Sequence, residues 1–160
     1  MASRFWTAFT LLGPVILAAG CGGDSGPTAP SAPTSFLAGT WTGTVTIERV
    51  GEQTVSGPVS WTFEVVPDTN RQSFRTTIRS QHAFLPVTIT GTSTLTPSNT
   101  PPARISTQGE YSSPRGCTGS ILSVGDAAAT TINADFSGID CTSLAQSTFR
   151  GRVTLTKTSS

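Results

Sequence analysis

The sequence predicts an all-β domain, an eight-stranded antiparallel up-and-down barrel, with a β-sandwich as the alternative fold. Apolar residues alternate with threonine, serine or charged residues along most of residues 36–160. The connections between the alternating runs are short and turn-rich, which leaves no room for the crossovers that parallel strands need. No segment shows a convincing helical repeat of apolar residues.

Eight segments have the period of two that is typical of half-buried strands. They occupy residues 40–47, 55–65, 74–79, 87–92, 103–108, 118–124, 132–136 and 149–156. In the first segment threonine fills every even position; in the second, Trp61 and Phe63 lie on the apolar phase. The third and fourth place arginine or threonine opposite the apolar phase, and the remaining segments continue the alternation. One polar and one apolar face per strand favour a sheet that closes around one core.

A separate leader precedes this domain. Arg4 is followed by an apolar run over residues 5–19, which is too short for a membrane-spanning helix. The run ends in the sequence LAAGC, which resembles the bacterial lipobox, where small residues precede a cysteine that becomes lipid-modified. The resemblance implies a signal peptide at residues 1–20 and lipidation of Cys21, including palmitate. The alternative is an ordinary secretory leader with a chance cysteine.

The organisation that follows has three parts: the signal peptide at 1–20, the lipidated Cys21 with a flexible linker at 21–35, and the domain at 36–160. The linker is rich in Gly, Ser, Thr and Pro and has almost nothing to bury. By the same resemblance, Gly22 stands where an aspartate would retain a lipoprotein in the inner membrane. We therefore expect a protein of the cell envelope that is anchored to the outer membrane through the lipid on Cys21.

Charge and composition argue against several classes of function. Lys and Arg number 10 against 9 Asp and Glu, without a basic block, so nucleic acid is not expected as a partner. The scattered acids and the single histidine predict no metal site, no cofactor and no enzyme activity. We expect His82 in an exposed loop, and Glu48 and Glu64 on the polar face of the sheet.

Two further cysteines remain once Cys21 carries lipid. Cys117 and Cys141 are expected to form a disulfide in an oxidising compartment. The alternative, a metal or redox pair, lacks the CxxC spacing. The disulfide would close a loop and contribute about 3 kcal/mol to stability by the chain-entropy model.

The same two cysteines suggest a register for the hairpin between them. If they face each other directly, Leu122 lies opposite Phe136 and Val124 lies opposite Ala134, both on the core face. In this register the disulfide lies on the other face and Ile121 points outward.

The start of the first strand carries the motif Gly39-Thr40-Trp41. This resembles the Gly-x-Trp signature of calycins, the lipocalin and avidin-like barrels. In lipocalins this tryptophan closes one end of the barrel beneath an arginine from the last strand. The resemblance implies a barrel in which Arg150 or Arg152 covers Trp41 through a cation–π contact.

Two hypotheses for function follow. The first is a binding module that holds a small apolar ligand among inward-facing aromatic residues, and the alternative is that these residues form only the core: Trp41, Trp61, Phe63, Phe74 and Phe136. The second is a non-enzymatic structural or protein-interaction module of the cell envelope. In that case the outer face would meet an envelope protein, with Arg75, Arg79 and Arg104 as a basic strip.

Overall fold

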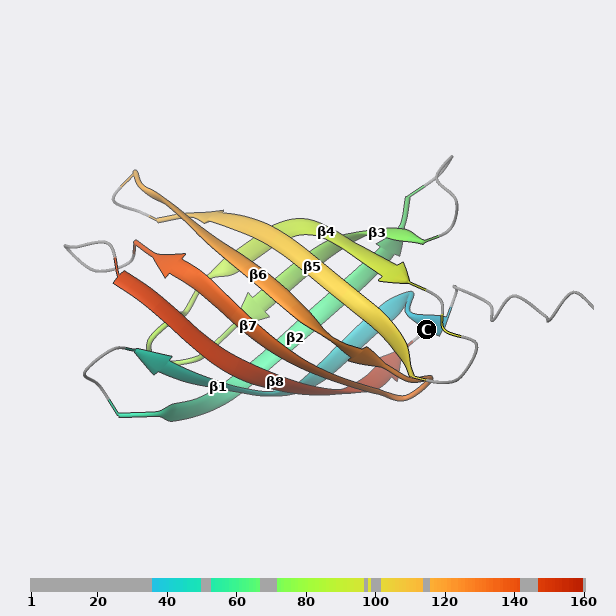
Figure 1. Cartoon of the computed structure of the whole chain (residues 1–160). Helices are drawn as coiled ribbons and strands as arrows, with labels where there is room; N and C mark the ends of the chain where they lie inside the picture. The colour runs from blue at the N-terminus through green and yellow to red at the C-terminus, as the bar shows by residue number, and fades with distance from the viewer. Residues whose placement is uncertain are drawn as a thin grey trace, which may run out of the picture.

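Eight antiparallel strands close into a barrel in the computed structural model (Figure 1). The structure describes residues 36–49, 53–66, 72–96, 98, 102–113, 116–141 and 147–159. The strands are β1 (Gly39–Arg49), β2 (Val55–Val65), β3 (Ser73–Ser80), β4 (Thr88–Thr96), β5 (Ala103–Ser112), β6 (Thr118–Ala127), β7 (Thr131–Asp140) and β8 (Ser147–Ser159). Each strand pairs with its neighbours in sequence, and β8 pairs with β1. The predicted fold class is confirmed, and the barrel takes the place of the sandwich alternative.

The predicted leader, the anchor at Cys21 and the linker lie outside the described residues. Within the described ranges, no helix is long and apolar enough to cross a membrane.

The alternation of side chains builds the core. Threonine and serine face outward along most strands, while aliphatic and aromatic residues face inward, because successive side chains of a strand point to opposite faces. Trp41 of β1, Phe63 of β2 and Phe74 of β3 pack together at one end of the barrel. The ring centroids of Trp41 and Phe63 are 6.4 Å apart, as are those of Phe63 and Phe74, and both pairs are edge-to-face.

The register expected for the β6–β7 hairpin is wrong by one residue. Ser123, not Leu122, lies opposite Phe136, and Gly125, not Val124, lies opposite Ala134. A one-residue slip moves every side chain of a strand to the other face. Leu122 and Val124 are therefore exposed, at 53% and 38%, and Ile121 is buried.

The cysteines gave the wrong register because they lie beyond the paired residues. The ladder between β6 and β7 ends at Ser120 and Ile139, and the Cys117–Cys141 disulfide joins the chain after that point. The two Cα atoms are 6.0 Å apart, so they need not be directly opposite each other in a ladder. Cys141 is buried and Cys117 packs against the core, which also corrects the expectation that the disulfide lies on the outer face.

A chain of hydroxyl groups crosses the core between β3, β4 and β5. The Ser93 hydroxyl oxygen lies 2.6 Å from that of Thr76 and 2.6 Å from that of Thr107, and all three residues are buried. Each hydroxyl can donate one bond and accept another, so the chain satisfies polar groups that water does not reach.

Replacing Ser93 by alanine is expected to lower the free energy of unfolding by about 1–3 kcal/mol, because it leaves the buried hydroxyls of Thr76 and Thr107 without their shared partner. The triple variant Thr76→Val, Ser93→Ala, Thr107→Val removes all three polar groups and is expected to be much closer to neutral. Urea denaturation measures both. A triple variant that loses more free energy of unfolding than the sum of the losses in its three single variants would contradict this account of the core.

The outer face carries cross-strand ion pairs instead of the expected basic strip. Arg75 lies 3.8 Å from Glu64, and Arg104 lies 2.9 Å from Asp126. Both pairs are exposed, so each contributes little to stability. Two of the three arginines are thus matched by acids on neighbouring strands, and Glu64 lies on the polar face as expected.

The end of the barrel where β1 begins and β8 ends is closed by Trp41. The Trp41 Nε1–H donates to Leu37 O at 2.9 Å, and both side chains are fully buried. Lys157 Nζ lies 5.7 Å from the centre of the Trp41 ring and donates to Phe36 O at 2.6 Å. In Figure 1 this end carries the label of the C-terminus.

The cation over Trp41 is therefore Lys157, and the expectation of Arg150 or Arg152 is wrong. Both arginines lie on the outward phase of β8, where Arg150 pairs with Glu48 and Arg152 pairs with Asp135. The Arg150 guanidinium lowers the pKa of the exposed Glu48 through its hydrogen bond and its charge. Lys157 has the inward phase, because it lies an even number of residues from the buried Val153 and Leu155.

Candidate functional site

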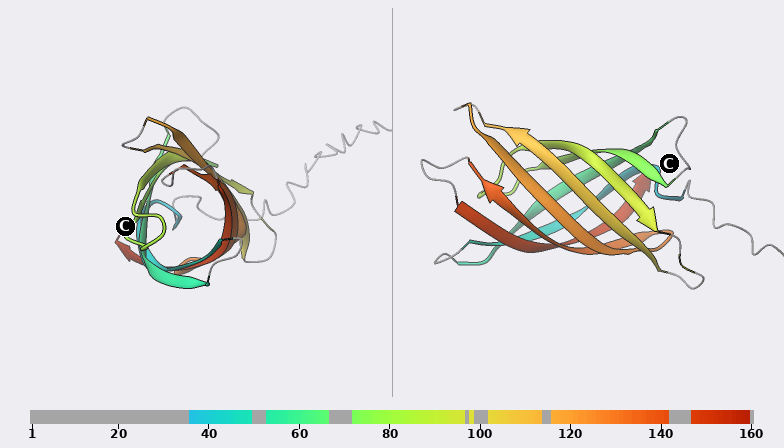
Figure 2. Two further views of the ribbon diagram at one scale, coloured as in Figure 1. Left: turned by 90° about the vertical axis from the view of Figure 1, so that its left-hand side faces the viewer. Right: turned by 45° about the horizontal axis from the view of Figure 1, so that its top comes forward.

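The opposite end of the barrel is covered by the β3–β4 loop, residues 81–87. The backbone N–H of Ser80 donates to Val87 O at 2.9 Å, which closes the loop at its base. The Gln81 N–H donates to Pro58 O at 3.1 Å and ties the loop to β2. Figure 2 (left) looks along the barrel from this end and shows the ring of strands around the interior. Two side chains of the loop, His82 and Leu85, are buried.

His82 is fully buried, which corrects its expected place in an exposed loop. Its Nε2 lies 2.8 Å from Val55 O, and its Nδ1 lies 3.0 Å from the backbone nitrogen of Phe84. A side chain at Gly57 would have no room, since a Cβ there would lie 2.9 Å from the Cα of His82. The absence of a side chain at Gly57 therefore allows β2 and the loop to approach closely.

Arg49, the last residue of β1, holds the tip of the loop. Its guanidinium donates to Phe84 O and lies 5.0 Å from the centre of the Phe84 ring, so it contacts both the backbone and the side chain. The same guanidinium pairs with Asp140 at 2.5 Å. Asp140 is fully buried at the end of β7, so this ion pair lies at the rim of the barrel, partly out of water.

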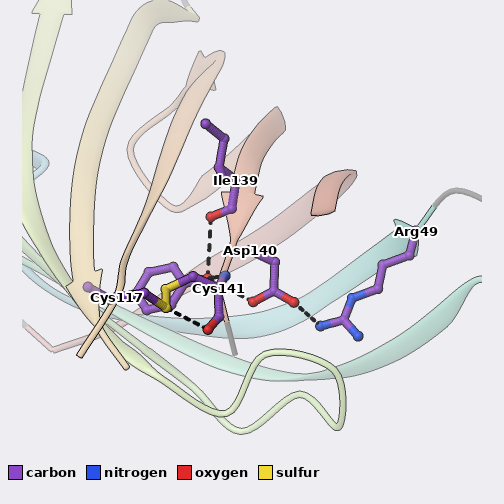
Figure 3. The surroundings of a disulfide bond; sticks show 6 residues. Arg49, Cys117, Ile139, Asp140 and Cys141 are labelled. Atoms are coloured by element: carbon purple, nitrogen blue, oxygen red, sulfur yellow. Dashed lines mark hydrogen bonds and ion pairs between the residues drawn. A yellow bond between two sulfur atoms is a disulfide. The ribbon is translucent and has the colours of Figure 1, made fainter. Parts of the chain in front are cut away.

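Asp140 connects this contact to the disulfide (Figure 3). Tyr111 donates its hydroxyl to Asp140 Oδ1 at 3.0 Å and accepts the backbone N–H of Cys141 at 3.3 Å. The Tyr111 ring occupies the space above Gly119, where any Cβ would collide with it. The rim thus forms a continuous set of contacts from the Cys117–Cys141 disulfide through Tyr111 and Asp140 to Arg49 and the β3–β4 loop.

Tyr111 is the only tyrosine in the chain, so its titration can be observed directly. Burial raises the pKa of Tyr111 to about 12, with the hydrogen bond and charge of Asp140 acting in the same direction. The folded state holds the phenol proton more tightly than the unfolded state, so the protonated phenol contributes to the stability of the fold. This contribution is complete below about pH 10 and is lost as the pH rises towards 12.

The ultraviolet absorbance of tyrosinate is expected to appear near pH 12 in the folded protein. A phenol that ionises near pH 10 while the protein remains folded would show that Tyr111 is hydrated, and would contradict its place in the rim.

A small cavity lies inside the barrel beneath the β3–β4 loop. Its volume is about 30 Å³, enough for one or two water molecules. Leu85 from the loop forms part of its lining, and Ser80 is the one hydroxyl residue among the lining side chains. The other lining residues are apolar: Val45, Ile47, Val59, Trp61, Ile78, Ile89, Ile121, Phe136 and Val153.

The structure separates the five aromatic residues that the sequence singled out. Trp61 and Phe136 line the cavity. Trp41, Phe63 and Phe74 are buried at the closed end and are not part of its lining. All five belong to one hydrophobic core.

Sequence reasoning missed the polar rim. Arg49, Tyr111 and Asp140 lie on the inward phase of their strands, so extending the alternation to the strand ends would have placed them inside. Across the residues that the structure describes, no three His, Cys, Asp or Glu side chains gather as metal ligands.

Comparisons with known proteins identify the architecture. No family model and no curated protein matches this sequence. A solved structure of EF1p2_mFAP2b bound to DFHBI matches with a TM-score of 0.50 at 19% identity, over 80% of this chain and 98% of the other. The likeness shows the fold alone. This fold, a closed barrel, also fits the expected calycin-like architecture.

Proposed function

We propose that this chain is a lipid-anchored, calycin-like protein of the cell envelope that binds a small apolar ligand inside its barrel, beneath the β3–β4 loop. The observation that carries the proposal is the position of the apolar cavity. It lies directly under a loop that is tied to the wall by a few polar contacts, while Trp41 and Lys157 close the other end. EF1p2_mFAP2b, which shares the barrel fold, was solved with DFHBI bound.

Binding requires the loop to move. Pockets for small molecules have volumes of about 300–1,000 Å³, ten times that of the present cavity or more. Withdrawal of the loop would remove Leu85 from the lining and add the volume of its side chain to the cavity. The contacts that must break are the bonds of His82 to Val55 O, of Gln81 to Pro58 O and of Arg49 to Phe84 O.

The anchor and the opening suit each other in this proposal. Lipid on Cys21 would hold the protein at the membrane, and the linker at residues 21–35 would join the domain ahead of Phe36. Phe36 and the start of β1 belong to the closed end, so the covered end points away from the attachment. The proposal includes no catalytic step, no cofactor and no contact with nucleic acid.

Binding of the apolar dye anilinonaphthalene sulfonate tests the proposal. Leu85→Ala enlarges the cavity and weakens the loop, so it is expected to raise the affinity for the dye. Leu95→Ala is the matched control, because Leu95 is equally buried but lies outside the cavity lining. Equal gains in both variants would show dye entering a loosened core, and an unchanged affinity in Leu85→Ala would also contradict the proposal.

An interaction module is the second candidate, and one observation favours it. Leu122 and Val124 on β6 and Ile139 on β7 form an apolar patch on the otherwise threonine-rich outer face, each at least 38% exposed. Patches of this kind occur at protein interfaces. Capture of an envelope protein that is lost in the variant Leu122→Ser, Val124→Ser, with the dye affinity unchanged, would favour this candidate over the first.

A further inference from the structure

We infer that protonation of His82 releases the β3–β4 loop, so that mild acid opens the covered end of the barrel. The inference rests on the proposed function for its purpose, since it concerns access to the same cavity. The opening itself is a property of the loop and needs no ligand to be observed.

The two ring nitrogens of His82 have fixed and different roles. The backbone N–H of Phe84 can only donate, so the Nδ1 that it faces must carry no proton. Val55 O can only accept, so the Nε2 beside it must carry the proton. The closed loop therefore selects the neutral imidazole with its hydrogen on Nε2.

A second proton on the ring has no acceptor in this arrangement. It would sit on Nδ1 and point at the N–H of Phe84, which brings two donors face to face. The charge would also lie in a ring that is fully buried, where an unpaired charge is costly. Displacement of Phe84 and the ring towards water relieves both problems, and that displacement opens the loop.

The charged groups around the loop offer no compensation. Arg49 from β1 reaches Phe84 O and is itself a cation, and Asp140 from β7 is engaged by Arg49 and Tyr111. From β2, Val55 and Gly57 contact the histidine with uncharged groups. Among the described residues no carboxylate pairs with His82; Glu52 lies outside them.

The size of the effect follows from proton linkage. The open loop lets the His82 ring take up a proton from water, whereas the closed arrangement has no acceptor for a second proton on the ring. Because the open state then binds one proton more than the closed state, the equilibrium constant for opening is expected to rise by up to about tenfold for each unit by which the pH falls.

Nuclear magnetic resonance of the purified ¹⁵N-labelled protein tests the inference without a ligand. His82 is the only histidine, so its ring signals are unambiguous. At neutral pH they should report the neutral ring with the proton on Nε2. As the pH falls, the amides of Ser80, Gln81 and Leu85 should lose protection against hydrogen exchange together, by up to about tenfold per unit. The ring should become protonated only as the open loop becomes the major state.

Two controls separate loop opening from other effects. The amides of Ala128 and Lys157, which are bonded at the closed end, should keep their protection across this range. His82→Gln should remove the pH dependence of exchange in the loop. A ring that becomes protonated while the loop stays protected, or a loop that opens in acid in His82→Gln as it does in the original protein, would overturn the inference. If the loop opens in acid but no apolar dye binds at any pH, the release of the loop by protonation of His82 is supported and the proposed function is wrong.

Discussion

Replacing Asp140 by alanine is expected to lower the free energy of unfolding by about 3–5 kcal/mol, the range for removing one partner of a buried ion pair. The variant takes from Arg49 its counter-charge and from Tyr111 the acceptor of its hydroxyl. Because Arg49 also holds Phe84 O, the β3–β4 loop should lose protection against hydrogen exchange beyond the global loss of stability.

The matched control is Asp135→Ala. Asp135 pairs with Arg152 at 3.0 Å on the outer face, but its side chain is 75% exposed. Water screens such a pair, so the loss should stay within about 1 kcal/mol. Urea denaturation compares the two variants. Equal losses would show that Asp140 is hydrated in solution and that the rim is not the polar network described above.

Replacing Trp41 by alanine is expected to cost about 3–5 kcal/mol, the usual range for deleting a large aromatic side chain from a core. Trp41 is fully buried and contacts the ring of Phe63 edge to face. The variant also leaves Leu37 O without the indole donor and Lys157 without the ring beneath it. The closed end should therefore unfold first.

Two gentler variants separate these contributions. Trp41→Phe keeps an aromatic ring and loses the bond to Leu37 O, for which about 1 kcal/mol is expected. Lys157→Met removes the cation and its bond to Phe36 O while keeping the apolar stem, and about 1 kcal/mol is expected again. Denaturation followed by tryptophan fluorescence measures all three variants, because Trp61 remains in each of them. If Trp41→Ala lowers the free energy of unfolding no more than Lys157→Met does, Trp41 is not the residue that stabilises the closed end.

The sequence predicted the barrel because its signal is repeated in every strand. Threonine occupies each even position of 40–46, and every odd position of 55–65 except Gly57 carries an apolar side chain. These two patterns allow only one choice of inward and outward faces. In β6 the pattern is ambiguous, since Ile121, Leu122 and Val124 are all apolar. There the register depends on pairing with β5 and β7, which the local sequence does not contain.

The candidate site was harder to predict, for a different reason. Burial of His82 depends on the loop folding back over the barrel end and on the space left by Gly57, both of which are tertiary features. The polar rim could have been predicted from the sequence, because Arg49, Tyr111 and Asp140 keep the inward phase of their strands. Polar residues at inward positions near strand ends are where the mouth of a barrel can carry specificity.

A titration of the ¹⁵N-labelled protein with anilinonaphthalene sulfonate, followed by nuclear magnetic resonance, tests the central claim most directly. Ligand binding beneath the β3–β4 loop predicts that the indole signal of Trp61 and the amides of His82 and Leu85 shift together, since these residues line or cover the cavity. Shifts confined to Leu122, Val124 and Ile139 on the outer face, or no shifts at all, would contradict it.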